Sequence, residues 1–369
     1  MIKTSKLSNF LTSIPLIESC IDQVISSGQE TSLFELRRIK NNRFKKRASL
    51  KKKHTKWLTY LGPLLINLEN EIFPIEVLPN RFIQDLSQNI EHYKKTFKNA
   101  IIILQNNDFS GASEDSLSAY AELFETCEDT VFAIWDTDNH HWVKLSIFLA
   151  SHSDYYFPAH PVFHDIYSRY TDHLLPNIYS GSLQWKRSFL LERYDHIVTN
   201  QRRMALFGKH GFYQKFGARN TTLVSVNREF EDVTFITEQY AAKTEAKRFE
   251  EWTNHLYHFI APVNNDLPYR LFDAIVTGGV PVVPEYYRPF FEKYSISVRP
   301  IYYNVGHLYE PQTLKEMVSV RAKQDYPLRH LTATLYVELV NRFHANHGLN
   351  QILCHIHETE LMPDYRWSS

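Results

Sequence analysis

Cysteine and glycine are both scarce in this sequence. Its 369 residues include 3 Cys and 11 Gly. The cysteines, Cys20, Cys127 and Cys354, are widely spaced and odd in number, which argues against a disulfide framework or a zinc knuckle and favours a reducing compartment. No stretch approaches the ~18 apolar residues of a membrane span, and residues 1–20 lack the apolar core of a secretory signal. We therefore expect a soluble, cytoplasmic protein.

Net charge is absent as well. Lys plus Arg and Asp plus Glu number 41 each, so nucleic acid is not an expected partner of the whole chain. The exception is residues 37–56, where eleven Lys or Arg occur without an acid. This basic segment is either a solvated face or a patch for anionic lipid headgroups, where each charge contributes ~1 kcal/mol. The second reading predicts a peripheral position at the inner face of a membrane.

Length and composition predict more than one globular domain. Apolar residues make up 43% and charged residues 22% of the chain, and 369 residues exceed one ordinary core. In the first half, the apolar runs within 98–108 and 129–138 read as strands. The stretch 110–129 between them has Ser113 or Ser110 as an N-cap and apolar residues at helical spacing. Strand, helix and strand of these lengths predict a parallel unit, continued by an extended piece at 153–161.

The second half repeats this alternation. We expect a domain boundary at 198, giving an N-terminal α/β domain (1–198), a C-terminal nucleotide-sugar-binding domain (199–327) and closing helices (328–369). Two α/β domains in tandem predict a cleft between them, with functional groups at the carboxyl ends of strands. The predicted strands of this half are 221–227, 232–238, 256–263 and 280–285, and the predicted helices are 241–255, 266–279 and 328–347.

The most informative segment is residues 259–298. A buried strand leads into Asn264, Asn265 and Asp266, and Pro268 suits the first turn of the following helix. Asp266, Arg270 and Asp273 follow an i, i+4, i+7 spacing and so share one helix face. Gly278 ends the helix and allows a tight turn into the next strand. A helix N-terminus beside an arginine suits a pyrophosphate, and an acid further along can accept hydrogen bonds from a ribose.

The stretch RLFDAIVTGGVPVVPEYYRPFFEKYSISV, residues 270–298, resembles the donor-site region of exostosin-type glycosyltransferases, and the similarity extends back to about residue 250. The wider group of two-Rossmann-domain (GT-B) enzymes has two acids eight residues apart, and Asn265 and Asp273 occupy those positions here. The first position is therefore an amide, which puts a sugar contact there in doubt. The resemblance also makes Lys209 and Arg219, in the Gly- and aromatic-rich stretch 206–220, candidates for neutralising a diphosphate.

This resemblance implies an α/β fold of two Rossmann-like domains facing a cleft, with a C-terminal helix packing back across them. It implies glycosyl transfer from a nucleotide sugar to a surface polysaccharide or lipid-linked glycan, inverting and metal-independent. The donor is then a co-substrate, and neither a cofactor nor a metal is expected.

The stretch VFAIWDTDNHHW, residues 131–142, has three open interpretations. Asp136 and Asp138 could hold a divalent metal against a diphosphate, could supply a catalytic base, or could only end a strand. Within the resemblance these residues face the acceptor, with Asp138 or His141 as the base that deprotonates its hydroxyl and Asp136 beside them.

Three other functions compete. A single-domain, metal-dependent (GT-A) glycosyltransferase would use Asp136-Thr137-Asp138 as its metal motif. A non-catalytic carbohydrate-binding protein of the same fold would explain the amide at Asn265, and another transferase class on this fold is the remaining competitor.

Overall fold

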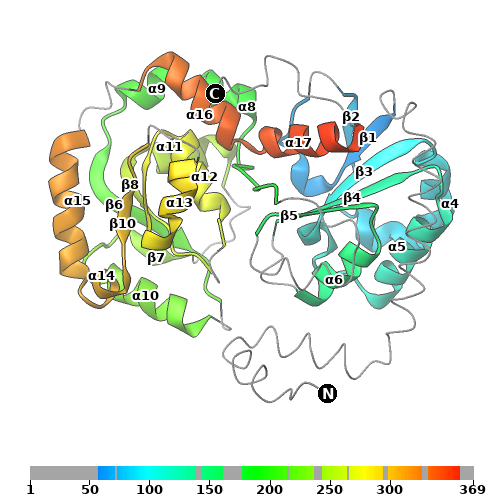
Figure 1. Ribbon diagram of the computed structural model, residues 1–369, viewed down its shortest axis with the longest axis horizontal. Helices are drawn as coiled ribbons and strands as arrows, with labels where there is room; N and C mark the ends of the chain where they lie inside the picture. Colours follow the sequence, from blue (N-terminus) through cyan, green and yellow to red (C-terminus); the bar gives the residue numbers. More distant parts are fainter. Residues whose placement is uncertain are drawn as a thin grey trace. The chain divides into compact units, whose positions relative to one another are not determined.

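A computed structural model describes residues 57–70, 73–137, 143–160, 177–213, 216–236, 243–263, 266–293, 298–325 and 331–357. Predicted features outside these residues are the basic segment 37–56, Asp138, His141 and Asn265. The chain is an α/β protein with two parallel five-stranded sheets (Figure 1).

Each sheet belongs to its own compact unit. Unit 1 is Met1–Tyr179 with Gly348–Asp364, and unit 2 is Ser180–His347 with Tyr365–Ser369. The division after Tyr179 lies earlier than the boundary expected at 198. Residues 180–199 go with unit 2 because Ser182 forms a β-bridge with His344 and Arg187 donates a 2.7 Å hydrogen bond to Asn341.

The sheet of unit 1 has the order β2-β1-β3-β4-β5, and all its neighbouring strands are parallel. The strand, helix and parallel strand predicted for residues 98–138 are confirmed as β3, α5 and β4, and Ser113 is the N-cap, accepting a hydrogen bond from the Ser116 amide. The elements of this unit are β1 (Leu58–Leu61), η2 (Pro63–Leu65), β2 (Ile75–Val77), α4 (Phe82–Thr96), β3 (Ala100–Gln105), η3 (Asn106–Phe109), α5 (Glu114–Thr126), β4 (Val131–Asp136), α6 (Val143–Ser151), β5 (Tyr155–Pro158) and most of α17 (Ala345–His357).

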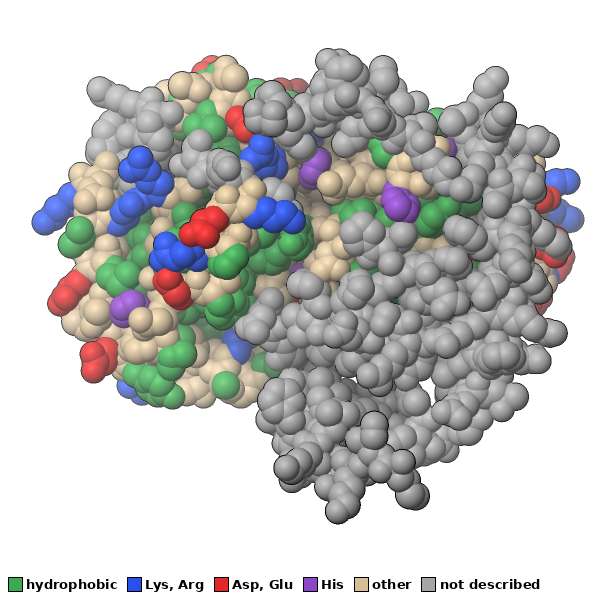
Figure 2. Space-filling model, in the orientation of Figure 1, with side chains coloured by type: hydrophobic (Ala, Val, Ile, Leu, Met, Phe, Trp, Pro, Cys, Tyr) green, Lys and Arg blue, Asp and Glu red, His purple; other side chains and the backbone are tan. Residues whose placement is uncertain are grey.

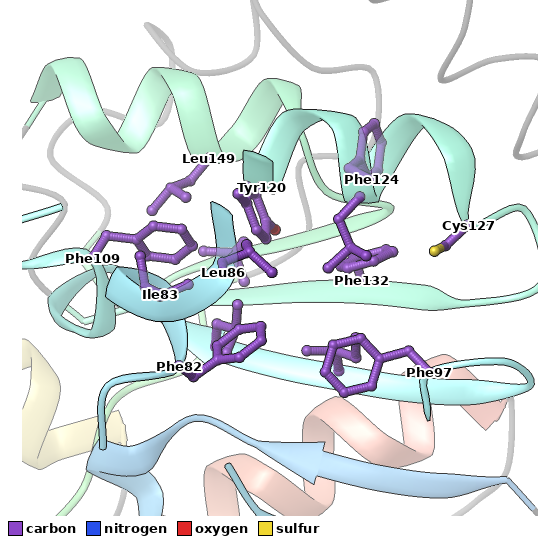
Figure 3. Packing of buried hydrophobic residues seen from close by; sticks show 14 of the residues in the cluster. Phe82, Ile83, Leu86, Phe97, Phe109, Tyr120, Phe124, Cys127, Phe132 and Leu149 are labelled. Carbon is purple, nitrogen blue, oxygen red and sulfur yellow. The ribbon is translucent and has the colours of Figure 1, made fainter. Parts of the chain in front are cut away.

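Alternate residues of the unit 1 strands build different layers because successive side chains of a strand point to opposite faces. Ile102, Leu104, Phe132 and Ile134 join the core formed with α4, α5 and α6 (Figure 3). Aromatic rings fill much of this layer, and Phe109 meets Tyr120 edge to face at 4.9 Å.

The opposite face of the same sheet is covered by α17. His355 of that helix packs edge to face on Phe157, and a side chain at Gly348 would meet the Trp135 ring. Because both faces are covered, the strands read as continuous apolar runs rather than alternating ones, as in other parallel sheets.

The sheet of unit 2 has the order β10-β9-β8-β6-β7 and is also parallel throughout. Helices α10, α14 and α15 build one layer with it, and α11 and α12 lie on its other face, with α16 packed on α12 (Figure 1). The elements of this unit are α8 (Arg187–Leu191), α9 (Tyr194–Thr199), β6 (Arg203–His210), α10 (Gly217–Asn227), β7 (Val233–Phe235), α11 (Glu245–Thr253), β8 (His255–Phe259), α12 (Tyr269–Val276), β9 (Val280–Pro284), η6 (Glu285–Tyr287), α13 (Arg288–Lys293), β10 (Ile301–Tyr303), α14 (Val305–Tyr309), α15 (Pro311–Asp325) and α16 (Ala333–Phe343).

Two secondary-structure predictions for unit 2 were wrong. Residues 221–227 form the end of helix α10 rather than a strand, and the first strand of the unit is β6. The β-branched residues of TTLVSVN favour a strand locally, but only Leu223 and Val226 of that stretch are buried, at the i, i+3 spacing of a helix face. Packing of that face against the sheet outweighs the local propensity.

The single terminal helix predicted over 328–347 is also wrong. His344 has extended backbone angles, φ −78° and ψ 147°, and separates α16 from α17. Its Nε2 lies 2.7 Å from the carbonyl oxygen of Trp185, and the adjacent Ala345 amide donates to Ser182. Strand-like pairing with residues 182–185 thus replaces the helical hydrogen bonds at this point.

None of the helices in the described ranges is long and apolar enough to cross a membrane. On the face shown in Figure 2, coloured Lys and Arg side chains lie among Asp and Glu side chains.

Candidate functional site

The carboxyl edge of the unit 2 sheet gathers charged and aromatic side chains from three segments. These segments follow β6, β8 and β9, whose last residues are His210, Phe259 and Pro284. Because the strands are parallel and adjacent, the residues that follow them meet at one edge of the sheet, where α/β proteins commonly bind ligands.

Arg219 joins two of these segments. It lies in the first turn of α10, its Nε donates to the Ala261 carbonyl at 3.0 Å and its Nη1 donates to the Gly211 carbonyl at 2.9 Å. Its Cζ also lies 5.0 Å from the centre of the Tyr213 ring. Burial lowers the pKa of the Arg219 guanidinium, but the ordinary pKa of arginine is so high that the side chain keeps its charge at neutral pH.

His210 supplies a buried, uncharged imidazole beside that guanidinium. Arg219 Nη2 lies 3.3 Å from His210 Nδ1, and Nδ1 accepts because a guanidinium can only donate. Burial, followed by the charges of Arg270 and Arg219, holds the pKa of His210 well below its ordinary value. The ring is therefore neutral at physiological pH, and the positive charge here belongs to the arginines.

Arg270 is the second arginine of this edge. It lies in the first turn of α12, half-buried, with its Cζ 5.4 Å from the centre of the Trp252 ring. Its charge acts on the pKa of both His210 and Arg219. Each of the two arginines lies in the first turn of its own helix, where backbone N–H groups and a cationic side chain both favour a nearby anion.

Asp266 supplies the counter-charge from the turn before α12. Its Oδ1 accepts from the Val263 amide at 2.6 Å, and the Tyr287 hydroxyl donates to its main-chain carbonyl. Burial, and then the charge of Asp266, raise the pKa of Tyr287 and of Tyr286. The turn is thus tied to η6, and Asp266 is buried.

Asp273 is fully buried one helical turn beyond Arg270. Ser182 Oγ donates to its Oδ1 at 2.7 Å and Gln184 Nε2 donates to its Oδ2 at 2.5 Å. Burial raises the pKa of this carboxyl to about 7, against the opposing effects of Ser182, Arg270 and Gln184. Both oxygens accept from the chain itself, so the ribose contact expected for Asp273 stays a prediction.

Two of the residues predicted for the donor have structural contacts of their own. Gly278, at φ +71°, is the C′ residue of α12: its amide bonds to the Ile275 carbonyl and the Gly279 amide bonds to Ala274, which is a Schellman motif. Eight helical residues separate the two ends of α12, so Gly278 lies ~12 Å from the first turn. Its role is to end the helix.

Lys209 points to the other face of the sheet. It forms an ion pair with Glu251 of α11, and Lys243 Nζ lies 3.1 Å from the same carboxylate. Phe207, two residues earlier, likewise packs on Trp252 of α11. Lys209 is therefore part of a lysine–glutamate cluster, on the face of the sheet opposite to His210 and Arg219.

In unit 1, Asp136 is the last residue of β4 and is fully buried. The Tyr156 hydroxyl donates to its Oδ2 at 2.6 Å. Asp138 and His141, the other residues predicted for catalysis, lie outside the described residues, and so does Asn265. Within the described part of the chain, no group of three or more His, Cys, Asp or Glu side chains is arranged to hold a metal.

His210 and Trp252 were missed by the sequence reasoning. The alternation of side-chain direction along β6 could have identified His210. Leu206 packs in the layer that contains α10, and residues 208 and 210 point to the same face of the sheet as Leu206. Lys209 was predicted to bind the diphosphate because it is charged, whereas its uncharged neighbour His210 is the residue that lies beside Arg219.

Comparison with protein-family models, with curated proteins and with solved structures finds no match for this chain. Its site is therefore interpreted from its own geometry.

Proposed function

We propose that the chain is a glycosyltransferase and that unit 2 binds the diphosphate of its nucleotide-sugar donor. The observation that carries the proposal is the pair Arg219 and Arg270 beside the buried, neutral His210, at the carboxyl edge of a parallel sheet. A diphosphate needs positive charge and N–H donors, and this edge offers both without requiring a metal ion.

The two parallel sheets support the finer proposal of a GT-B-like enzyme built from two Rossmann-like domains. The resemblance to exostosin-type enzymes favours inversion at the anomeric carbon. The proposed acceptor is a surface polysaccharide or a lipid-linked glycan on the cytoplasmic side of a membrane. The basic segment 37–56 is proposed to contact anionic headgroups there.

In the proposed reaction the acceptor hydroxyl oxygen attacks the anomeric carbon of the donor. The bond from that carbon to the diphosphate oxygen breaks, and the nucleoside diphosphate leaves with the bonding electron pair. Arg219 and Arg270 stabilise the negative charge that develops on the leaving group. A base takes the hydroxyl proton, and Asp138 or His141 is proposed for this role because Asp136 is fully buried with Tyr156 bonded to it.

Asp273 has an indirect part in this proposal. By accepting hydrogen bonds from Ser182 and Gln184, it ties the segment that enters unit 2 to the helix that carries Arg270. We assign it the positioning of α12, and contact with the ribose remains a further expectation for this residue.

The proposal is tested by thermal unfolding of the full chain with UDP, GDP, CDP, CMP and their sugars, each in Mn²⁺ and in EDTA. A ligand present at 100 times its Kd stabilises by ~2.7 kcal/mol, so the donor class is expected to raise the Tm in EDTA. A shift that requires Mn²⁺ would instead favour the metal-dependent alternative with Asp136 and Asp138. If none of the compounds raises the Tm, the donor site proposed here is wrong and carbohydrate binding without catalysis becomes the better account.

A further inference from the structure

Exposed tyrosines gather at the carboxyl edge of the unit 2 sheet. Among the described residues, three tyrosines are exposed: Tyr213, Tyr286 and Tyr309. Tyr213 lies in the segment after β6, and Tyr286 lies in η6, directly after β9. These two strands are the neighbours of β8 on either side. Two of the three exposed tyrosines therefore follow the strands that also lead to the arginines of this edge.

The buried hydroxyl of Tyr303 shows that Tyr286 and Arg219 lie close together. This hydroxyl donates to the Ile260 carbonyl at 2.7 Å, directly after the end of β8. Burial raises its pKa well above the ordinary value, and Tyr286, Arg219 and Asp266 also act on that pKa. Because electrostatic effects fall with distance, Tyr286 and Arg219 are both near this one hydroxyl.

The ring of Tyr286 is held in place while it stays open to solvent. It meets the ring of Tyr287 edge to face, with the centroids 5.1 Å apart and the planes at 80°. Tyr287 is buried, and its hydroxyl donates to the main-chain carbonyl of Asp266. Tyr286 itself is 51% exposed. A ring that is supported from one side and exposed on the other can receive a second flat ring.

The neighbouring charges narrow the class of ligand. Arg219 and Arg270 favour an anion, and an exposed aromatic ring beside them favours a flat, unsaturated ring. Inorganic diphosphate has only the first character, and a free base has only the second. A nucleoside diphosphate carries both on one molecule. Every nucleobase has a π-face, so stacking adds affinity without choosing among the bases.

We propose that Tyr286 is the residue on which the nucleobase of the donor stacks, beside the diphosphate site of Arg219 and Arg270. The ligand is the nucleotide part of the proposed donor, so this contact rests on the proposed function. The role is specific to the base, whereas the arginines bind the phosphates of any diphosphate.

The test is isothermal titration of the full chain, in EDTA, with UDP, GDP, CDP and inorganic pyrophosphate. Pyrophosphate carries the charge of a diphosphate without a base. Tyr286→Ala should weaken the binding of the nucleoside diphosphate at least ~fivefold, the lower end of base–aromatic stacking, and should leave the pyrophosphate affinity within about twofold. Tyr286→Phe keeps the ring and should bind both as the wild type does.

Tyr309→Ala is the matched control. Tyr309 is the most exposed of the three tyrosines, at 82%, and it is the last residue of α14. The carbonyl of the preceding residue, Leu308, accepts from Ser225 near the end of α10, whereas Arg219 lies in the first turn of that helix. Removal of this tyrosine should change neither affinity.

Tyr286→Trp gives a direct readout of stacking. The fluorescence of an indole is quenched when a nucleobase stacks on it, so the nucleoside diphosphate should quench this variant more than it quenches the wild type. Pyrophosphate should produce no such difference. A tyrosine that only supports the turn at Asp266 would not produce quenching that depends on the base.

Three outcomes would overturn the inference. If Tyr286→Ala binds the nucleoside diphosphate as tightly as the wild type, the base lies elsewhere, while the proposed diphosphate site stands. If this variant loses affinity for pyrophosphate equally, Tyr286 only supports the arginines. If none of the four compounds binds to the wild type, the donor site of the proposed function is wrong, and the base contact is wrong with it.

Discussion

Ser182 and Asp273, 91 residues apart in the chain, form a buried 2.7 Å hydrogen bond in which the serine hydroxyl donates to the carboxylate. Gln184 Nε2 completes the environment of this carboxyl, while Gln184 Oε1 is buried without a partner. The amide orientation of a glutamine is an assignment, and the opposite orientation would let Oε1 accept a proton from a neutral Asp273. The site therefore suits the protonated acid as well as the carboxylate.

This arrangement predicts a specific pH dependence of stability. Burial raises the pKa of Asp273 to about 7 in the folded state, while an unfolded aspartate titrates near ~3.9. Between these two pKa values the folded state holds a proton on Asp273 that the unfolded state has lost. Protonation of Asp273 therefore contributes fully to the free energy of unfolding below pH ~4, and this contribution is lost as the pH rises to about 7.

Asp273→Asn tests this sign. The variant keeps a similar shape and can bond to Gln184 in its opposite orientation, but it does not titrate. Urea unfolding from pH 5 to pH 8 should show the wild type losing on the order of 3 kcal/mol relative to Asp273→Asn. Parallel pH profiles for the two proteins would contradict the raised pKa.

Arg270→Ala should weaken nucleoside diphosphate binding 10- to 100-fold, because it removes one charge-assisted contact to a phosphate. Stability should change by no more than ~1 kcal/mol, since the side chain is half-buried and packs on Trp252. Isothermal titration with the diphosphate that raises the Tm measures the loss.

Lys209→Ala is the matched control for that variant. It also removes one positive charge near the end of β6, but this charge is already paired with the Glu251 carboxylate. The affinity of this variant for the nucleoside diphosphate should stay within about twofold of the wild-type affinity. A twofold change is far smaller than the tenfold change that corresponds to ~1.4 kcal/mol of binding free energy. Equal losses in both variants would show a long-range effect of charge rather than a contact by Arg270.

His258 predicts the opposite pH dependence from Asp273. It is fully buried, its ring stacks on Trp252 at 4.8 Å, and neither ring nitrogen has a well-formed hydrogen bond within the described residues. Burial, and then the charge of Arg202, hold the pKa of His258 well below its ordinary value. The unfolded chain then binds the extra proton below pH ~6.5, so stability falls as the pH drops through that value.

His258→Phe keeps a flat ring against Trp252 and cannot titrate. Between pH 6.5 and pH 5 the wild type should lose stability relative to this variant in urea unfolding. Equal losses would mean that the histidine is protonated in the folded state.

Substitution of Gly278 and of Gly111 by alanine distinguishes the cost of backbone strain from the cost of steric overlap. Both have positive φ, +71° and +74°. A Cβ at Gly278 would lie 2.7 Å from Ile197 Cγ2, whereas one at Gly111 would meet nothing within 4 Å. Gly111→Ala should therefore cost ~1 kcal/mol for the backbone alone, and Gly278→Ala should cost ~2–4 kcal/mol because overpacking is added. Urea unfolding of the pair gives the difference, and similar values would show that Ile197 moves aside freely.

The sequence by itself determined the local elements of this protein. The apolar runs at Ala100–Gln105 and Val131–Asp136 read as buried strands, and Ser113 as an N-cap. The Gly278–Gly279 pair likewise marked the end of α12. Each of these depends on neighbours within a few residues, where spacing and backbone preference decide the outcome.

Tertiary packing decided the rest. It made residues 221–227 a helix against their β-branched composition, and it turned His210 rather than Lys209 toward Arg219. It also placed Ser182 on Asp273 and left the Asn106 amide unpaired in a closed turn. These outcomes depend on which face of an element is buried and on partners far away in the chain, and a local pattern carries no record of either.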